Sequence, residues 1–397
     1  MLIIASVIVM AFSGVREAGA QWVDVDQGAA GSSFAIAGEY IFAGTAGEGI
    51  LLSTNSGSSW SAVNNGLTSS TISAFALSDT NLFAGTNLDG IFLSTNKGAS
   101  WTVINTGSEV YSLLANGTNL FSSTISGVYL TTNNGISWKV ADSGLGSALA
   151  LTLVMIDSNI FAGTTHGVFL TTNNGASWSS KSDGLTNLEV FSIANVGENI
   201  FAGTFGGGIF LTTNKGANWT PVNVGLKDTL VRTLVVSGRT LFAGTNDSGL
   251  FLSTNNGSIW IDVSANLSGW ANPVVALAAN DSDLFAGLAF GGIWRRPLAQ
   301  MIGLNNVTLA KPEQSFTAYP NPFSQSTTIS FSSPESGAAE VSIVNLLGSE
   351  VKRIFSGELE AGEHSFAWDA SGMPPGMYEC VVRSNGKARQ IPIVLER

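Results

Sequence analysis

The sequence predicts an all-β protein, a seven-bladed β-propeller closed by its N-terminal strand and followed by a small C-terminal β-sandwich. A phrase such as "FLSTNKGASW", ending at Trp101, occurs six times, and its tryptophans are 41, 37, 40, 41 and 41 residues apart. A repeat of about 40 residues is the length of a four-stranded propeller blade. A second phrase, "FAGT" or a variant of it, occurs seven times, at Phe42, Phe83, Phe121, Phe161, Phe201, Phe242 and Phe285.

Each unit contains four short β-rich runs separated by turn residues. In one unit these runs are 71–77, 81–86, 90–96 and 100–105, and no helical periodicity interrupts them. The last unit lacks a fourth run after "GGIWRRP", but "QWVDVDQG" at 21–28 aligns with "SWTVINTG" and places Trp22 where the other tryptophans fall. Because an open sheet edge invites aggregation, we expect the N-terminal strand to close the ring.

The first repeated phrase has an Asn, a Gly and a Trp at fixed places. They are Asn55, Gly57 and Trp60; Asn96, Gly98 and Trp101; Asn133, Gly135 and Trp138; Asn173, Gly175 and Trp178; Asn214, Gly216 and Trp219; and Asn255, Gly257 and Trp260. An Asn side chain accepts backbone N–H bonds in a turn, Gly permits a positive φ, and Trp packs between blades. We therefore expect a structural role. Calcium would need several convergent carboxylates or carbonyls, and these turns contain no carboxylates, so no metal or cofactor is expected.

This phrase resembles the Asp-box, or BNR, repeat with the pattern S/T-x-D-x-G-x-S/T-W, with Asn in place of the acidic residue. That repeat is known from sialidases, sortilin-like receptors, xyloglucan-degrading enzymes and photosystem assembly factors. Sialidases hold a substrate carboxylate with three arginines, whereas residues 21–300 contain only Arg232, Arg239, Arg295 and Arg296. We therefore reject sialidase activity. The xyloglucan-degrading enzymes use two propellers, and here only one is predicted.

The loops between second and third strands, together with the loops between blades, are predicted to lie on one face, where propellers usually bind ligands. They contain the candidate catalytic residues Glu48, Asp89 and Asp247 and the candidate ligand-binding residues His166, Phe205, Phe290 and Trp270. Two carboxylates across a cleft could form a glycosidase, but acidic residues in exposed loops are also ordinary turn formers. The aromatic side chains could stack on a sugar or peptide, or pack within the channel mouth. A single histidine in these loops makes neither a triad nor a metal site.

Composition excludes several kinds of partner. The net charge is −11 and only 11% of residues are charged, with no basic stripe for nucleic acid or anionic lipid. The single cysteine, Cys380, cannot form an internal disulfide and is predicted to be a buried strand residue. The apolar run 2–12 is too short to span a bilayer, and with "AGA" at 18–20 it predicts a signal peptide, 1–20, cleaved before Gln21. No other stretch is long enough for a membrane helix.

After a propeller at 21–298 and a linker at 299–317, residues 318–397 alternate apolar and polar side chains as in a small β-sandwich. This segment resembles the type A C-terminal sorting domain of the type IX secretion system of Bacteroidetes. The matching motifs are "YPNPF" at 319–323, "VSIVNLLGSEV" at 341–351 and "GEHSFAWDASGMPPGMY" at 362–378. The resemblance implies contact with the secretion machinery and export through the outer membrane, followed by surface attachment or release.

We therefore expect an exported, monomeric protein whose propeller serves as a binding or adhesion module for a glycan or a protein. A polysaccharide-degrading glycoside hydrolase that uses the loop carboxylates is one alternative, and a structural surface-layer component is another. The loops discriminate among these functions. A hydrolase requires a close carboxylate pair, a lectin requires exposed aromatic side chains, and a surface-layer protein requires neither.

Overall fold

The structure is a computed structural model of the chain. It describes residues 21–26, 28, 30–78, 80–247, 249–267, 273–302, 316–319, 321, 323–333, 336–345, 349–384 and 387–396. The expected signal peptide and Trp270 lie outside these residues. The chain divides into two units, Met1–Leu304 and Asn305–Arg397.

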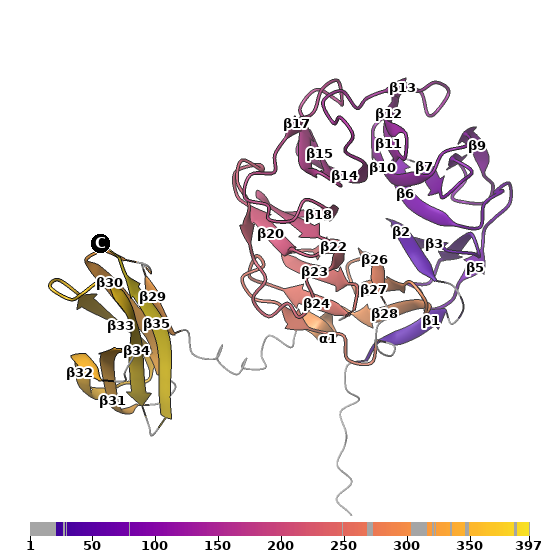
Figure 1. The fold of residues 1–397 in the computed structure, drawn as a ribbon. Coiled ribbons are helices and arrows are strands. Elements are labelled where there is room, and N and C mark those ends of the chain that lie inside the picture. Colours follow the sequence, from indigo (N-terminus) through magenta and orange to yellow (C-terminus); the bar gives the residue numbers. More distant parts are fainter. Residues whose placement is uncertain are drawn as a thin grey trace, which may run out of the picture. The chain divides into compact units, whose positions relative to one another are not determined.

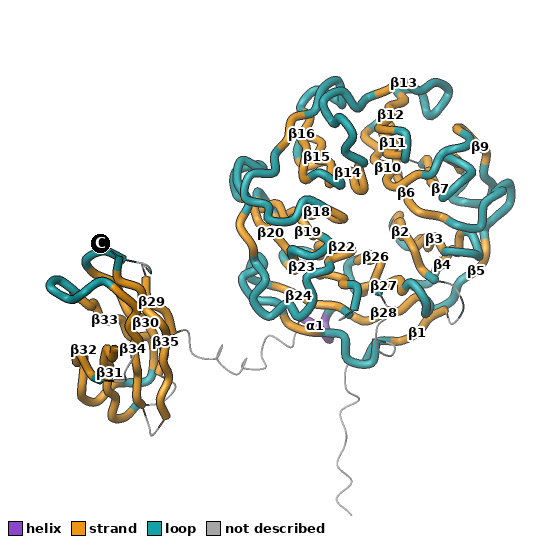
Figure 2. The backbone as a smooth tube through the Cα atoms, in the orientation of Figure 1, coloured by secondary structure: helices purple, strands orange, loops and turns teal. Residues whose placement is uncertain are grey.

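The described residues of the first unit form seven four-stranded antiparallel sheets arranged in a ring (Figures 1 and 2). The first strands are β2 (Gly31–Ala37), β6 (Ile72–Ser78), β10 (Val110–Asn116), β14 (Ala150–Ile156), β18 (Val190–Val196), β22 (Val231–Ser237) and β26 (Val274–Ala279). The second strands are β3 (Tyr40–Thr45), β7 (Asn81–Thr86), β11 (Asn119–Thr124), β15 (Asn159–Thr164), β19 (Asn199–Thr204), β23 (Thr240–Thr245) and β27 (Asp283–Leu288). The third strands are β4 (Ile50–Ser53), β8 (Ile91–Ser94), β12 (Gly127–Thr131), β16 (Gly167–Thr171), β20 (Gly208–Thr212), β24 (Leu250–Ser253) and β28 (Ile293–Pro297).

The fourth strands are β5 (Ser61–Ala62), β9 (Thr102–Asn105), β13 (Lys139–Val140), β17 (Ser179–Ser180), β21 (Thr220–Pro221), β25 (Ile261–Asp262) and β1 (Val23–Asp26). Five of them have only two residues, which is shorter than the sequence patterns indicated. The neighbouring first strands contact one another all the way round, including β2 with β26. The first strands are therefore the innermost strands of the ring.

The N-terminal strand closes the ring, as the sequence predicted. Strand β1 pairs antiparallel with β28, with Val23 opposite Arg295. Trp22 is 4% exposed, and its Nε1 donates a 2.9 Å hydrogen bond to the carbonyl of Val263 in the sixth blade. The last blade is therefore built from both ends of the propeller chain.

The glycine of "FAGT" is required by the close approach of the next blade. A Cβ placed on Gly85 would lie 2.5 Å from Cγ1 of Val110 on the first strand of the third blade. Such a separation is far inside van der Waals contact. The third blade has Ser123 at this position, and the residue equivalent to Val110 is there the smaller Ala150. The blade that has a side chain larger than glycine at this position therefore faces a smaller residue on the next blade.

The six Asn-Gly-Trp turns share one hydrogen-bond network. In the first blade, Oδ1 of Asn55 accepts a 3.0 Å bond from the Ser53 hydroxyl and a 2.9 Å bond from the Ser59 N–H. The Ser53 hydroxyl oxygen in turn accepts a 2.9 Å bond from the N–H of Gly57, whose φ is 76°. The side chains thereby satisfy backbone groups that the turn leaves without a strand partner.

The indole N–H groups of five of the seven repeated tryptophans bond to the preceding blade. Trp101, for example, donates to the carbonyl of Val63 at 2.8 Å. In the described structure, the buried Nε1 atoms of Trp60 and Trp138 have no hydrogen-bond partner. The equivalent acceptors would be the carbonyls of Val25 and Ile104, where β1 and β9 each carry a register shift. A bulge turns the backbone groups of its extra residue away from the regular direction, which accounts for the two missing bonds.

A single helical turn, α1 (Ala299–Ile302), follows the last blade. The sequence showed no helical periodicity, and we expected these residues to begin the linker. Met301 is fully buried among apolar side chains of the last two blades, Leu284 and Leu250 included. This packing holds the turn against the ring.

The described residues of the C-terminal unit form two antiparallel sheets. One has the order β29 (Phe316–Tyr319), β30 (Ser326–Ser333), β33 (Gly362–Asp369), and the other β32 (Glu350–Leu359), β31 (Gly337–Asn345), β34 (Gly376–Ser384), β35 (Lys387–Leu395). Residues of both sheets, such as Phe331, Ile343 and Trp368, share one buried core. Cys380 is fully buried within it. The unit is the small β-sandwich that its sequence predicted.

Candidate binding site at the loop end of the ring

The loops between second and third strands all lie at the end of the ring where the first strands begin, because Thr45 at the end of β3 pairs with Gly31 at the start of β2, and the other blades repeat this register. We call this end the loop end. In six of the seven blades the threonine that ends the second strand shapes this loop, and the last blade has Leu288 there. Thr45 Oγ1 donates to the carbonyl of Gly49 at 2.9 Å and accepts the N–H of Glu48 at 2.9 Å. Thr86, Thr124, Thr164, Thr204 and Thr245 donate in the same way.

The three candidate carboxylates lie at the loop end in separate loops of the first, second and sixth blades. Glu48 and Asp247 are exposed and Asp89 is half-buried. Oδ2 of Asp89 accepts a 3.3 Å bond from the Thr68 hydroxyl, and Oδ1 of Asp247 accepts a 2.7 Å bond from the side chain of its neighbour Asn246. Asp89 and Asp247 are thus each bonded to a neighbouring polar side chain.

The candidate ligand-binding residues are also at the loop end where the structure describes them. His166 is exposed, with its Nδ1 3.0 Å from the Thr165 hydroxyl. Phe290 is 83% exposed. Phe205 is half-buried, and its ring centroid lies 5.2 Å from that of Phe191.

A ring of seven residues at the loop end was not predicted from the sequence. Every first strand has a register shift around its second residue, so that this residue has no partner on the second strand. The seven, which we call the bulge ring, are Ser32, Ser73, Tyr111, Leu151, Phe191, Arg232 and Val275. A bulge re-aims a side chain and is often found beside a functional site. An alignment of the seven repeats offers a signal for them, since this column varies widely beside a column of mostly Val and Ile.

Members of the bulge ring make different contacts. The hydroxyl of Ser32 donates to the carbonyl of Ile72 at 2.5 Å and that of Ser73 donates to the carbonyl of Val110, so these serines tie neighbouring blades together. Tyr111 is half-buried. Burial raises the pKa of its phenol above the ordinary value, and the nearby carboxylate of Glu109 raises it further. Tyr111 is therefore an uncharged hydrogen-bonding group at neutral pH.

Arg232 connects the bulge ring to the loops. Its Nε and Nη2 donate to Oδ1 of Asn246 at 3.0 and 2.7 Å. Its guanidinium carbon lies 5.0 Å from the ring centroid of Phe205 and 5.5 Å from that of Phe191. This arrangement joins the fifth and sixth blades through cation–π contacts.

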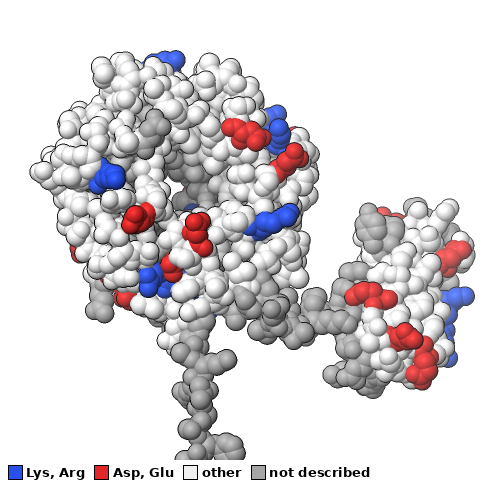
Figure 3. Space-filling model, turned by 180° about the vertical axis from the view of Figure 1, so that it is seen from behind, with Lys and Arg blue, Asp and Glu red and all other residues white. Residues whose placement is uncertain are grey.

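Charged side chains are sparse around the ring. Figure 3 shows one face of the first unit, with an opening at the centre of the ring and a surface that is mostly uncharged.

Among the described residues, no group of three or more His, Cys, Asp or Glu side chains is placed to hold a metal ion. No described helix is long and apolar enough to cross a membrane.

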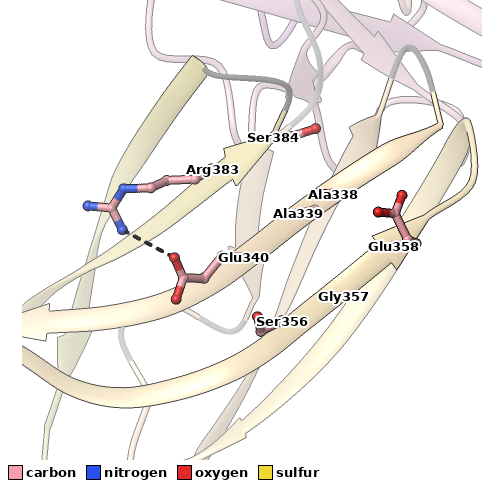
Figure 4. Close-up of a pocket in the computed structure, with 8 residues that line it drawn as sticks. All are labelled: Ala338, Ala339, Glu340, Ser356, Gly357, Glu358, Arg383 and Ser384. Atoms are coloured by element: carbon pink, nitrogen blue, oxygen red, sulfur yellow. Dashed lines mark ion pairs between the residues drawn. The ribbon is translucent and has the colours of Figure 1, made fainter.

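An open pocket of about 380 Å³ lies on the C-terminal unit, between β31, β32 and β34 (Figure 4). Within it, the Glu340 carboxylate lies 4.0 Å from Nη1 of Arg383 and, on its other oxygen, 2.8 Å from Nε of Arg353. The charge of Glu340 is thus balanced by two guanidinium groups. None of the candidate site residues lines this pocket.

Comparison with solved structures shows a propeller fold. YCF48 from Cyanidioschyzon merolae matches with a TM-score of 0.56 and 15% identity, covering 70% of this chain and 98% of that chain. YCF48 bound to D1 peptide matches with a TM-score of 0.58 and 14% identity, covering 70% and 96%. The GH74 xyloglucanase from Xanthomonas campestris matches with a TM-score of 0.55 and 14% identity, covering 94% and 68%. At these identities the likeness establishes the fold alone. No curated protein matches the sequence.

The C-terminal segment also matches a known family. Residues 317–396 match the model of the secretion system C-terminal sorting domain. This match agrees with the resemblance to the type IX sorting domain and covers nearly all of the second unit. The chain is therefore an exported protein that reaches the medium or the outer-membrane surface, and it carries a propeller together with its sorting domain.

Proposed function

We propose that this exported protein is a binding module that recognises a glycan or a protein at the loop end of its propeller. The observation that supports this most is the bulge ring, which brings Tyr111, Phe191 and Arg232 to the same end as the loops. The bulge recurs at the same position in every first strand, and bulges are often found beside functional sites.

Exposed apolar side chains in the surrounding loops also support binding. Leu88 is 74% exposed, Ile125 is 61% exposed and Phe290 is 83% exposed, and all three belong to loops between second and third strands. They lie in loops of the second, third and seventh blades, and exposed apolar surface of this kind is what a binding partner would cover. YCF48, a protein of similar fold, has been solved with a bound peptide.

Glycoside hydrolysis is the second candidate, since a GH74 xyloglucanase shares the fold. It requires two carboxyl groups about 5–10 Å apart. Glu48, Asp89 and Asp247 would have to supply them, yet each carboxylate sits in the loop of a different blade. The binding function needs no such pair.

The test uses the full-length protein, fluorescently labelled, on arrays of immobilised polysaccharides and peptides. We expect retention that is lost in the double variant Leu88→Ser/Phe290→Ser. The matched control is Ile136→Ser/Val140→Ser, which changes two similarly exposed residues, 86% and 63% exposed, away from the loop end. Retention that falls equally in both variants, or no retention at all, would contradict the proposal.

Release of reducing ends from the same polysaccharides distinguishes the second candidate. Activity that disappears in Glu48→Gln/Asp89→Asn/Asp247→Asn would establish a glycosidase instead. These substitutions keep side-chain size and remove only the charge and proton affinity of the carboxylates, so folding is little disturbed.

A further inference from the structure

Arg232 is a half-buried cation that has no carboxylate partner among the described residues. The described ion pairs involve other lysines and arginines, for example Lys227 with Asp262 at 2.8 Å. Its hydrogen bonds to described residues use Nε and Nη2, and both reach the neutral amide oxygen of Asn246. In a chain with a net charge of −11, a half-buried guanidinium without a counter-ion is unusual.

The contacts of Arg232 hold its guanidinium in one orientation. Asn246 fixes the edge formed by Nε and Nη2, while the rings of Phe191 and Phe205 lie within 5.5 Å of the guanidinium carbon. An arginine fixed in this way loses little side-chain entropy when it binds, and its remaining N–H groups match the two oxygens of a carboxylate. The geometry therefore favours an anion, and a carboxylate in particular.

The surrounding charges limit how many carboxylates a ligand can have. Glu189, Asp228 and Asp247 lie in the loops that flank Phe191, Arg232 and Asn246 at the loop end. A polyanion such as a polyuronic acid would meet these like charges, which are repulsive. A ligand with a single carboxylate places one negative charge at Arg232 and keeps the rest of its length uncharged, so it meets less of this repulsion.

The surrounding apolar groups indicate what the rest of the ligand contains. Leu188, 45% exposed, precedes Glu189 in the same loop, and the exposed Leu88, Ile125 and Phe290 lie in other loops of the loop end. The aliphatic side chains of Leu188, Leu88 and Ile125 offer a sugar neither hydrogen bonds nor a flat stacking face. They match the apolar side chains of a peptide.

We infer that Arg232 binds the C-terminal carboxylate of an apolar peptide. Phe191, Phe205 and Asn246 hold the guanidinium in place, and the apolar loops receive the side chains that precede the carboxylate. This inference rests on the proposed function, because it places the peptide at the loop end.

The test screens the full-length protein against a library of random peptides that ends in a free carboxylate and against the same library ending in an amide. We expect enrichment of apolar peptides from the free-acid library only. Fluorescence anisotropy of a selected peptide should show at least a tenfold loss of affinity for Arg232→Gln and for the amidated peptide. Arg232→Lys should lose most of the affinity as well, because lysine cannot bind bidentately.

Arg239→Gln is the matched control. Arg239 is an exposed arginine in the turn between β22 and β23, at the other end of the same strand as Arg232, and its substitution should leave affinity unchanged. Circular dichroism and thermal unfolding of both variants check that the fold is kept. Equal binding of acid and amide peptides, unchanged affinity in Arg232→Gln, or binding of polygalacturonate that depends on Arg232 would overturn the inference. If Leu88→Ser/Phe290→Ser weakens binding but Arg232→Gln does not, the proposed function stands and the carboxylate anchor fails.

Discussion

Trp22 and Val263 are 241 residues apart in sequence, yet the indole N–H of Trp22 donates a 2.9 Å hydrogen bond to the Val263 carbonyl. This bond and the pairing of β1 with β28 join the N-terminal strand to the last two blades. Trp22→Ala should lower the free energy of unfolding by about 3–5 kcal/mol, measured by denaturant unfolding followed by tryptophan fluorescence. Val23→Ala, at a position 51% exposed, is the control and should have little effect. Equal effects would mean that Trp22 does not contribute to closure.

The Asn of the repeated turns acts mainly through its oxygen. Oδ1 of Asn96 accepts bonds from the Ser94 hydroxyl and the Ser100 N–H, both at 2.9 Å, while Nδ2 donates to the Ser100 hydroxyl at 2.9 Å. Asn96→Asp keeps an oxygen that can accept both bonds and should lower the free energy of unfolding by less than about 1 kcal/mol. Asn96→Ala removes the acceptor and should lower it by about 1–3 kcal/mol. Thermal unfolding of the two variants makes the comparison. A larger loss in the Asp variant than in the Ala variant would show that the amide group is the essential part.

The close approach of Gly85 to Val110 predicts a coupled pair. Gly85→Ser should lower the free energy of unfolding by about 1–3 kcal/mol, because its Cβ would lie 2.5 Å from Cγ1 of Val110. Adding Val110→Ala removes that methyl group and recreates the combination of Ser123 with Ala150. A double-mutant cycle from denaturant unfolding should give a favourable coupling of about 0.5–3 kcal/mol. Strict additivity would show that the methyl group does not limit the side chain at position 85.

Cys380 should be unreactive in the folded protein. Burial raises the pKa of its thiol from 9.0 to about 12, so almost no thiolate is present at pH 8. A thiol reagent should label it only after unfolding. Since the unfolded thiol ionises near pH 9 and the folded one near 12, the stability associated with the neutral thiol is complete below pH 9 and is lost as the pH rises from 9 toward 12. Rapid labelling of the native protein at pH 8 would contradict this prediction.

Secretion should depend on the C-terminal unit. Because residues 317–396 match a secretion sorting domain, a chain lacking 318–397 should accumulate in the periplasm. Cell fractionation and immunoblotting measure this. Leu88→Ser/Phe290→Ser in the full-length chain is the control and should be secreted normally. Normal secretion of the truncated chain would refute the sorting role.

Repetition made most of the fold predictable. The four runs of each unit and the alignment of Trp22 with the later tryptophans were sufficient to predict the blades and the closing strand. The bulge ring was missed because a strand pattern with period two assigns Tyr111 and Arg232 to ordinary positions, whereas a bulge is set by the backbone. The contact of Arg232 with Phe191 and Phe205 depends on two neighbouring blades, and no local pattern describes it.

The closing strand also sets the order in which the molecule can form. Strand β1 is synthesised before every other strand of the ring and its partner β28 after every other one. More than 260 residues must emerge before the two can meet, and contacts so distant in sequence form slowly. The ring therefore stays open, with the edge of β28 unpaired, until the last blade has emerged.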